Sequence, residues 1–558
     1  MKKYNLLKVL AIMVFITWIL TLVIPGSYVD YSGKVTTNTI AGLGVWGLLT
    51  NLNISISYFN NIAVFLIAVA CFYAVLDKIS LYNDFVSNVS KVFKGKERTF
   101  VIIVTLVFGI LSLFINEFLV LIAFVPFIYK VMKELSIDKK VILASTLVAA
   151  LIGSMCSIYN STLFSAFSLK INTLLLVKII IFVVSISILT ILIAPKNSSK
   201  KQKKASKEKE TKEELKNTKT KKVATKSKAK KVNKTLYAVL TILFGSIGIN
   251  KFYAGQIKKG ILSILFCWTL IPAILSVAEF ITVLTEKADK TGKIEVTSER
   301  RNKVAFIVSV VIFALFIIAS IIPYESLFKN CTVFTEFNSW LSNLKIGNYA
   351  IFNNIIGSPL IVSESTGSTT GSIAVFGSWT MSDVSILLFI LTLLIAIINN
   401  VKIDDFIKGI NENIKKILPV AITAMLISVV LVTMITSGIS ITIANKILSI
   451  FKGFNIAETI FATMISSVLT SDFYYLISTV GQLLTLSASN SQYYGVIAFI
   501  IQSIYNLVMI IAPTSVGLII GLYYLDIPYN KWFKFIWKLL LILFVIIIVA
   551  TIVIYALV

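Results

Sequence analysis

Two acidic residues stand inside apolar stretches of the chain, where a charged side chain could do chemistry. Glu117 lies in "SLFINEF" and Asp472 lies in "LTSDFYY". An unpaired charge inside a bilayer costs about 3 kcal/mol or more, so an acid kept there favours a role in binding a proton, a cation or a substrate amine. The alternative is that both stretches lie at a membrane surface and the acids face water.

Polar residues also interrupt two other apolar stretches, at "GSMCSIYNST" and at "QSIYN" with the nearby "APTS". They supply neutral donors and acceptors where helical hydrogen bonding is expected to lapse, and the freed amides of a helix start can hold a carboxylate. For any one of these residues, satisfying the nearby backbone is an equally good explanation. The candidate substrate-binding residues are Asn160, Ser161, Thr162, Gln502, Asn506, Thr514 and Ser515.

The chain lacks the residues that most enzymes and metal sites need. It contains no histidine, and its four cysteines stand far apart, at Cys71, Cys156, Cys267 and Cys331. A Ser-His triad is therefore excluded, and no metal or redox spacing is present. We expect no enzyme, no metal site and no cofactor, with a proton or sodium as the coupling ion of a carrier.

The composition places the chain in a membrane. Of the 558 residues, 57% are hydrophobic and 14% charged, and the mean hydropathy is +0.90. Apolar runs of about 20 residues, the length that a helix needs to cross the hydrocarbon, recur from end to end. We therefore expect a multi-pass protein of the cell membrane.

Half of the net charge of +26 is concentrated in one segment, residues 196–234, which holds 17 lysines and 4 glutamates. Low apolar content and like-charge repulsion predict a disordered cytosolic linker. It has no interleaved aromatic residues for base stacking, so contact with anionic lipid is favoured over binding of nucleic acid.

Lysine and arginine collect in cytoplasmic loops, so their positions predict the side on which each loop lies. With the amino terminus in the cytoplasm, we predict six elements in residues 5–195, the first half of the chain. They are a span at 5–24, an outer loop at 25–60, a span at 61–77, a hairpin at 100–129, a broken helix at 141–170 and a span at 171–195. For residues 304–557, the second half, we predict an extra crossing followed by a second series of elements. They are the crossing at 304–322, an outer loop at 323–382, a span at 383–398, a basic loop at 399–416, a crossing at 418–450, a hairpin at 456–490, a broken helix at 493–525 and a last span at 535–557.

The same order of elements thus occurs twice, with opposite sense in the membrane. The tetrapeptide SIYN, at Ser157–Asn160 and Ser503–Asn506, falls in both broken helices, and the hairpin sequence Asn116-Glu117-Phe118 corresponds to Ser471-Asp472-Phe473. Inverted repeats with discontinuous helices are typical of secondary transporters. We predict an all-α polytopic membrane protein with an inverted repeat, two re-entrant hairpins, two broken helices and an inserted two-helix hairpin.

Several stretches resemble the YfcC-type carriers, a family that includes arginine/ornithine antiporters and is similar to the anaerobic dicarboxylate carriers of the ion transporter superfamily. They are "FITWILTLVIPGSYVDYSGK", "FGILSLFINEFLVLIAFVPF", "IGSMCSIYNSTLF" and the carboxy-terminal "AFIIQSIYNLVMIIAPTSVGLIIGLYYLDIPYNKWFKFIWKLL". The resemblance covers 5–195 and 304–557. It implies a secondary carrier with two hairpins and two broken helices around a central site, working by an elevator-like movement.

The segment between the halves is similar to the TM-two domain, a pair of helices joined by a short turn. The stretch "LFGSIGINKFYAGQIKKGILSILFCWTLIPAILSVAEFITVL" carries the pattern. Glycines let two helices approach closely. The matching residues are Gly245, Gly248, Phe252, Tyr253, Gly255 and Gly260.

The chain therefore divides into a first transporter half (1–195), the lysine-rich linker (196–234), the insert (235–286), a basic linker (287–303) and a second transporter half (304–558).

The predicted central site contains no basic residue. The arginines fall in predicted cytosolic loops, and Lys170, Lys178 and Lys446 fall near predicted membrane edges. Acids together with free helix ends suit an amino acid, with its carboxylate on a helix end and its amine on Glu117 or Asp472.

We predict a secondary-active carrier, an exchanger or an ion-coupled symporter, of an amino acid or related small carboxylate. The alternative is a non-transporting membrane sensor or scaffold that acts through the linker and the insert. The expected partners are a small-molecule substrate and the lipid bilayer. The sequence leaves open whether the chain forms a homodimer, and it disfavours nucleic acid as a partner.

Overall fold

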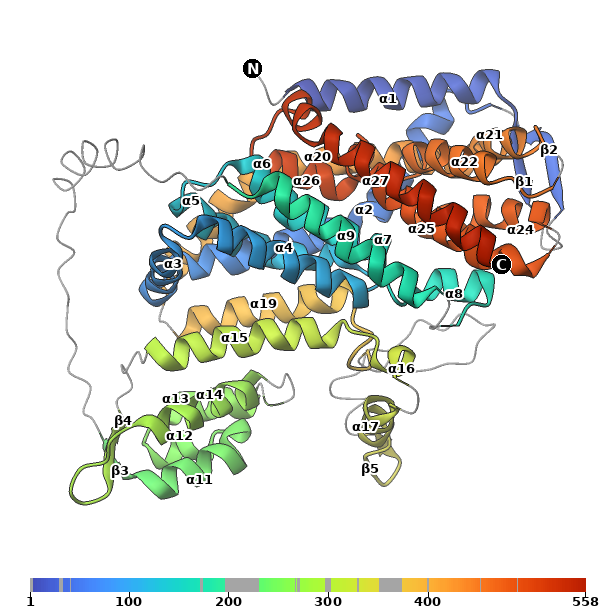
Figure 1. Cartoon of the computed structure of the whole chain (residues 1–558). Coiled ribbons are helices and arrows are strands. Elements are labelled where there is room, and N and C mark those ends of the chain that lie inside the picture. The colour runs from blue at the N-terminus through green and yellow to red at the C-terminus, as the bar shows by residue number, and fades with distance from the viewer. Residues whose placement is uncertain are drawn as a thin grey trace, which may run out of the picture.

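The structure is a computed structural model, and it describes residues 4–29, 34–40, 42–170, 174–195, 230–265, 267, 271–296, 303–328, 331–350, 374–398, 401–451, 453–488 and 490–558. Most of the predicted 196–234 linker lies outside these residues. The described chain is built almost entirely from helices that run side by side (Figure 1).

Five of the described helices are long and apolar enough to cross a membrane, by length and composition. They cover Val45–Leu76, Glu97–Phe114, Leu175–Ile193, Ile417–Ser437 and Tyr529–Leu557. Their backbone groups are paired within each helix, as an apolar solvent requires. The protein is a polytopic all-α membrane protein.

The first half begins with α1 (Tyr4–Val23), the paired strands β1 (Gly26–Val29) and β2 (Val35–Ile40), and the long helix α2 (Val45–Leu76). There follow α3 (Ser80–Phe93), α4 (Glu97–Phe114), the 3-10 helix η1 (Phe118–Phe124) and α5 (Val125–Glu134). It ends with α6 (Lys139–Leu143), the π-helical turn η2 (Ala144–Val148), α7 (Ala149–Met155), α8 (Ser161–Phe167) and α9 (Leu175–Ile193).

The second half opens with α15 (Lys303–Ser320), α16 (Tyr324–Leu327), α17 (Val333–Ser342), the strands β5 (Lys345–Ile346) and β6 (Tyr349–Ala350), and α19 (Met381–Ile398). There follow α20 (Ile403–Ser437), α21 (Ile439–Leu448), α22 (Ile456–Leu469), α23 (Phe473–Leu476), the π-helical turn η5 (Ile477–Gly481) and α24 (Gln482–Ala488). It ends with η6 (Ser491–Tyr493), α25 (Tyr494–Met509), α26 (Val516–Tyr524) and α27 (Tyr529–Leu557).

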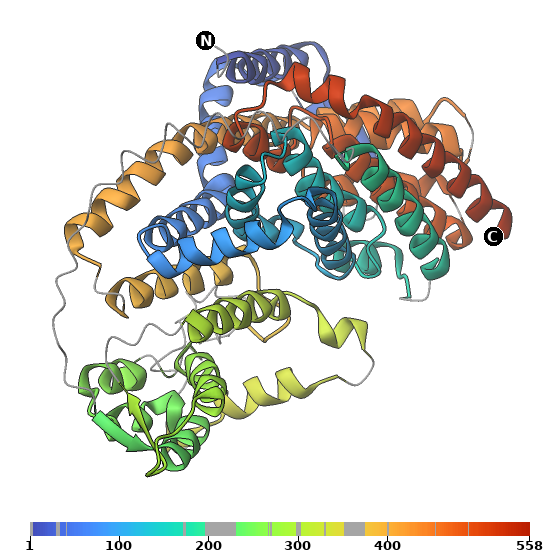
Figure 2. The ribbon, with the colours of Figure 1, turned by 60° about the vertical axis from the view of Figure 1, so that its left-hand side comes forward.

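The insert contains β3 (Lys230–Asn233), α11 (Lys234–Phe244), η3 (Gly245–Ile247), α12 (Ile249–Tyr253), α13 (Ile257–Leu265), α14 (Ile271–Thr285) and β4 (Lys293–Val296). Figures 1 and 2 show it as a group of helices set apart from the rest. It contacts the second half where α14 packs against α15. Because β3 pairs antiparallel with β4, the two ends of the insert lie side by side.

Helix ends follow local sequence. Gly438 takes a left-handed conformation, with φ of +65°, and separates α20 from α21. Asn455 caps α22 by accepting hydrogen bonds from Ala457 N and Glu458 N. Pro528 precedes the first turn of α27, where its missing N–H costs nothing.

The two halves share one core. Helix α2 packs against α20 and α19, α25 packs against α7 and α22, and α27 packs against both α25 and α9. Helices α4 and α7 approach so closely that a Cβ on Gly153 would lie 2.2 Å from Gly109 O. Such contacts between backbones replace the hydrophobic effect as the source of helix association in lipid.

Four sequence predictions are corrected by these elements. The predicted outer loop 25–60 contains a strand pair and the start of α2, and the predicted basic loop 399–416 contains the start of α20. The second SIYN, at 503–506, lies inside α25 rather than at a break. The insert has more helical segments than the predicted pair, because positive φ angles at Gly248 and Gly255 turn the chain between them.

Candidate functional site

The first helix break covers residues 156–160, between α7 and α8. Asn160 caps α8, its Oδ1 accepting a hydrogen bond from Leu163 N at 3.0 Å. Ile158 N donates to Leu113 O at 2.9 Å, and the Ser157 hydroxyl has two acceptors within reach, Tyr159 O at 2.7 Å and Leu113 O at 3.2 Å. Leu113 is one residue from the end of α4, so the break satisfies a carbonyl that α4 leaves without a helical partner.

The second break covers residues 510–515, between α25 and α26. Ser515 caps α26, accepting a hydrogen bond from Leu518 N at 3.4 Å. The Thr514 hydroxyl donates to Val468 O at 2.7 Å. Val468 is one residue from the end of α22, so each break places a hydrogen-bond donor on the last turn of a different helix.

A buried lysine joins the first break to α25. Lys178, in the first turn of α9, is only 6% exposed. Its ammonium donates to Ser157 O at 2.9 Å and to Gln502 Oε1 at 3.0 Å. The Gln502 amide donates in turn to Ser154 O at 2.8 Å. The two halves therefore meet at a polar contact inside the helical core.

Buried polar atoms without a hydrogen-bond partner lie on the helices around this contact. Asn506 donates to Gln502 O at 2.8 Å through its amide nitrogen, while its Oδ1 has no partner. Other such atoms are the hydroxyls of Ser112 on α4, Thr463 and Ser466 on α22, and Ser503 on α25. Unpaired buried polar groups are costly, so they mark places where water or a ligand would be stabilised.

The two predicted acids both accept hydrogen bonds from backbone amides. Glu117, exposed between α4 and η1, accepts from Met381 N at the start of α19, at 3.2 Å. Asp472, half-buried, caps α23 by accepting from Tyr475 N at 2.7 Å. No hydrogen bond joins the two carboxylates to each other. Both lie at a helix start, where the dipole favours negative charge.

The other predicted site residues differ in how deeply they are buried. Gln502, Asn506, Thr514 and Ser515 are buried in the core, whereas Ser161 is exposed and Thr162 half-buried in the first turn of α8. Lys178, which the sequence places near a predicted membrane edge, is buried beside the first break. Its one signal in the sequence is an ionisable residue inside the apolar run 175–193, a pattern that marks function by default.

An apolar cavity of about 110 Å³ lies elsewhere, between α2, η1, α20 and α26. Leu66, Phe118, Ile417 and Ile520 contribute to its wall. None of the predicted substrate-binding residues or acids lines it. The cavity suits apolar groups and is separate from the polar contact at the first break.

Close packing explains several glycines of the insert. A Cβ on Gly245 would lie 2.3 Å from Ser276 Cβ, so η3 can approach α14 only with glycine there. A Cβ on Gly260 would lie 2.6 Å from the Phe252 ring, and Gly248, with φ of +76°, lies against Gly260. The Phe252 ring therefore occupies the space that a side chain at position 260 would need.

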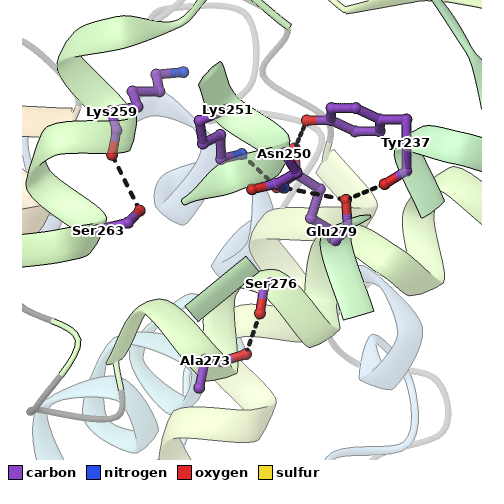
Figure 3. A network of polar contacts seen from close by, with 9 residues as sticks. Tyr237, Asn250, Lys251, Lys259, Ser263, Ala273, Ser276 and Glu279 are labelled. Carbon is purple, nitrogen blue, oxygen red and sulfur yellow. Dashed lines mark hydrogen bonds and ion pairs between the residues drawn. The ribbon is translucent and has the colours of Figure 1, made fainter. Parts of the chain in front are cut away.

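A half-buried acid, Glu279, organises the polar contacts of the insert (Figure 3). The Tyr237 hydroxyl donates to Glu279 Oε1 at 2.6 Å, and the Asn250 amide donates to Glu279 Oε2 and Thr241 Oγ1, each at 3.1 Å. The Lys251 ammonium forms an ion pair with Glu279. The network ties α11, α12 and α14 together. Glu279 was not among the predicted site residues, although it stands in an apolar stretch of the sequence.

A turn stabilises the end of the insert outside its apolar helices. Asp289 Oδ1 accepts hydrogen bonds from the Thr291 hydroxyl at 2.7 Å and from Thr291 N and Lys293 N, both at 2.9 Å. These donors, with the hydroxyl contributing most, hold the pKa of Asp289 well below its usual value. The turn leads directly into β4.

Comparison with known proteins identifies the insert. Residues 230–281 match the family model of the TM2 domain. An uncharacterized membrane protein, YozV of Bacillus subtilis (strain 168), is 54% identical over 54 residues, which are 10% of this chain and 68% of YozV. No match to the YfcC-type family accompanies it.

Proposed function

The chain belongs to the membrane proteins that carry a TM2 domain, here at residues 230–281, and we propose that the helices on either side of this domain form a secondary-active carrier. Its substrate is an amino acid or a related small carboxylate. Two inverted halves surround a central site, and the site reaches each side of the membrane in turn by an elevator-like movement. The amino terminus lies in the cytoplasm.

The observation that carries this proposal is the matching contact at the two helix breaks. Ile158 N donates to Leu113 O in the first half, and the Thr514 hydroxyl donates to Val468 O in the second. In each case a donor at the break satisfies the carbonyl of the penultimate residue of an earlier helix, α4 or α22. Glu117 and Asp472 follow these helices at corresponding positions. Discontinuous helices in two related halves are the usual frame of a carrier's central site.

The second break offers the better place for a substrate carboxylate. Helix α26 begins there, and its first amides carry the positive end of the helix dipole. Asn506 Oδ1, buried and unpartnered in the last part of α25, provides an acceptor for a donor group of the substrate. Glu117 and Asp472 remain the groups for a coupling proton, sodium ion or substrate amine.

Uptake into proteoliposomes tests this function. The purified chain is reconstituted, and radiolabelled amino acids and dicarboxylates are offered with and without internal counter-substrate, a proton gradient or a sodium gradient. We expect saturable uptake of at least one carboxylate that depends on a counter-substrate or a gradient. Uptake no faster than in protein-free liposomes across the whole panel contradicts the proposal.

The second candidate is a membrane sensor or scaffold without transport. One observation favours it: the cavity between α2, η1, α20 and α26 is apolar, and none of the predicted substrate-binding residues lines it. Such a protein would act through the insert and the lysine-rich segment. The same uptake panel separates the two functions, since a sensor moves no substrate.

A further inference from the structure

Lys178 is a buried ammonium held by neutral oxygen atoms. Its acceptors are the carbonyl of Ser157 and the side-chain oxygen of Gln502, at 2.9 and 3.0 Å. In the part of the chain that the structure describes, the ion pairs do not include Lys178. A buried charge normally needs an opposite charge, so the oxygen atoms around this one must stabilise a cation by themselves.

The position of these oxygen atoms explains how they do so. Ser157 O follows the carboxyl-terminal end of α7, whose helical hydrogen bonding ends at Cys156. This end of a helix carries partial negative charge and favours a cation. Carbonyls at an unwound helix end are also the groups that coordinate monovalent ions in carriers with broken helices.

Gln502 is oriented to complete this environment. Its amide nitrogen donates to Ser154 O at 2.8 Å, which turns Oε1 toward Lys178. Gln502 is itself only 1% exposed. The acceptors come from α25 and the first break, and the hydrogen bond to Ser154 O orients the one on α25.

We propose that the Lys178 ammonium is a tethered monovalent cation that fills an oxygen-lined cation site at the first helix break. Removing the side chain while leaving its space open creates a site for a free cation, either sodium or a small alkylammonium ion. This site does not depend on the proposed carrier function. If the chain is a carrier, which rests on that proposal, the first break needs no exchangeable ion, and ion coupling belongs elsewhere.

Thermal unfolding of the purified full-length chain in detergent tests the proposal without a substrate. Lys178→Ala is compared with wild type in choline chloride, sodium chloride and n-propylammonium chloride at equal ionic strength. The n-propylammonium ion carries the three carbons and the ammonium that truncation beyond Cβ removes. We expect the Tm of the variant to fall in choline by roughly 4 °C or more, and n-propylammonium or sodium to restore part of the loss in a saturable way.

Two variants serve as controls. Lys178→Met fills the space with an apolar side chain, so its Tm should fall without any restoration by a cation. Lys446→Ala removes an exposed lysine on α21 and should respond to salts as wild type does. A Lys178→Ala variant that gains no more from sodium or n-propylammonium than wild type overturns the proposal, as does a Lys178→Met variant with the wild-type Tm.

The proposal stays testable if Lys178→Ala does not withstand purification in choline. The readout is then the yield of monodisperse protein after solubilisation in each of the three salts. Recovery in sodium or n-propylammonium alone supports the cation site, and equal loss in all three salts contradicts it. A chain that passes this test and fails every uptake assay has the cation site without the carrier function.

Discussion

The ammonium of Lys178 lies 3.0 Å from Oε1 of Gln502, although 324 residues separate the two in the sequence. Lys178 belongs to α9 in the first half and Gln502 to α25 in the second. The contact is therefore a direct link between the two halves at the edge of a helix break.

We expect this contact to show in a double-mutant cycle of Lys178→Met and Gln502→Leu. Hydrogen bonds to charged groups contribute about 1.5–3 kcal/mol, and removing either partner forfeits the same interaction. The double variant should therefore lose clearly less stability than the sum of the single variants. Thermal unfolding in detergent measures all four proteins, and strict additivity would show that the pair makes no joint contribution.

Asp472 should stabilise the protein through its role as a helix cap. Asp472→Ala removes the acceptor for Tyr475 N and should cost about 1 kcal/mol, the usual value for a lost cap. Asp472→Asn keeps an acceptor oxygen and serves as the matched control, with stability close to wild type. Equal losses in both variants would assign the effect to the charge instead of the cap.

The coupling role of the two acids is tested separately in proteoliposomes. We expect Glu117→Gln and Asp472→Asn to abolish gradient-driven accumulation and to keep substrate exchange, because exchange needs no net movement of a proton or cation. Asp404→Asn, which changes an exposed acid at the start of α20, is the control.

Two other results for the acids are distinguishable. Loss of both accumulation and exchange, with weaker apparent affinity, would assign the carboxylates to a substrate amine. Wild-type behaviour in both variants would make Glu117 and Asp472 structural caps only.

The contact between η3 and α14 in the insert should be sensitive to one methyl group. Gly245→Ala places a Cβ within 2.3 Å of Ser276 Cβ and should destabilise the protein by about 1–3 kcal/mol, the usual cost of overpacking. Adding Ser276→Gly removes the clash and should restore much of the loss. Gly44→Ala is the control, since nothing lies within 4 Å of its Cβ. Thermal unfolding without rescue by the second change would contradict this packing.

The Asp289 turn should protect the end of the insert from trypsin. Asp289→Ala removes the acceptor for Thr291 and Lys293, so we expect faster cleavage after Lys290 and Lys293 than in wild type. Asp289→Asn keeps one acceptor and should fall between the two. Cleavage rates of all three proteins are followed by mass spectrometry of the fragments.

The pH dependence of this turn follows from the direction of the pKa shift. The folded-state pKa of Asp289 is below its unfolded value, so its stabilising contribution is complete above the unfolded pKa and is lost as pH falls through the folded one. The protection relative to Asp289→Ala should therefore not change between about pH 5 and pH 8. A steady decline across that range would show that another group controls the turn.

The sequence by itself determined that this is a helical membrane protein with a TM2-like insert. Apolar run length and hydropathy depend only on local composition, because each helix in lipid must satisfy its own backbone. The glycine pattern of the insert is also present in the sequence, and close packing, such as that of Gly245 against Ser276, gives it a physical reason. Helix breaks were predictable near 156–160 and 512–515, where polar residues and proline interrupt apolar runs.

Only the tertiary structure decided which residues meet. The tetrapeptide SIYN does not indicate that one copy lies in a break and the other inside α25. A helix break depends on distant groups that bond to it, here the carbonyls of Leu113 and Val468, which accept from Ile158 N and from the Thr514 hydroxyl. Lys178 looked peripheral because its position in the sequence is near the start of a span. Its ammonium reaches the core through a side chain several bonds long, and the oxygen atoms that stabilise it come from two other elements that no local pattern brings together.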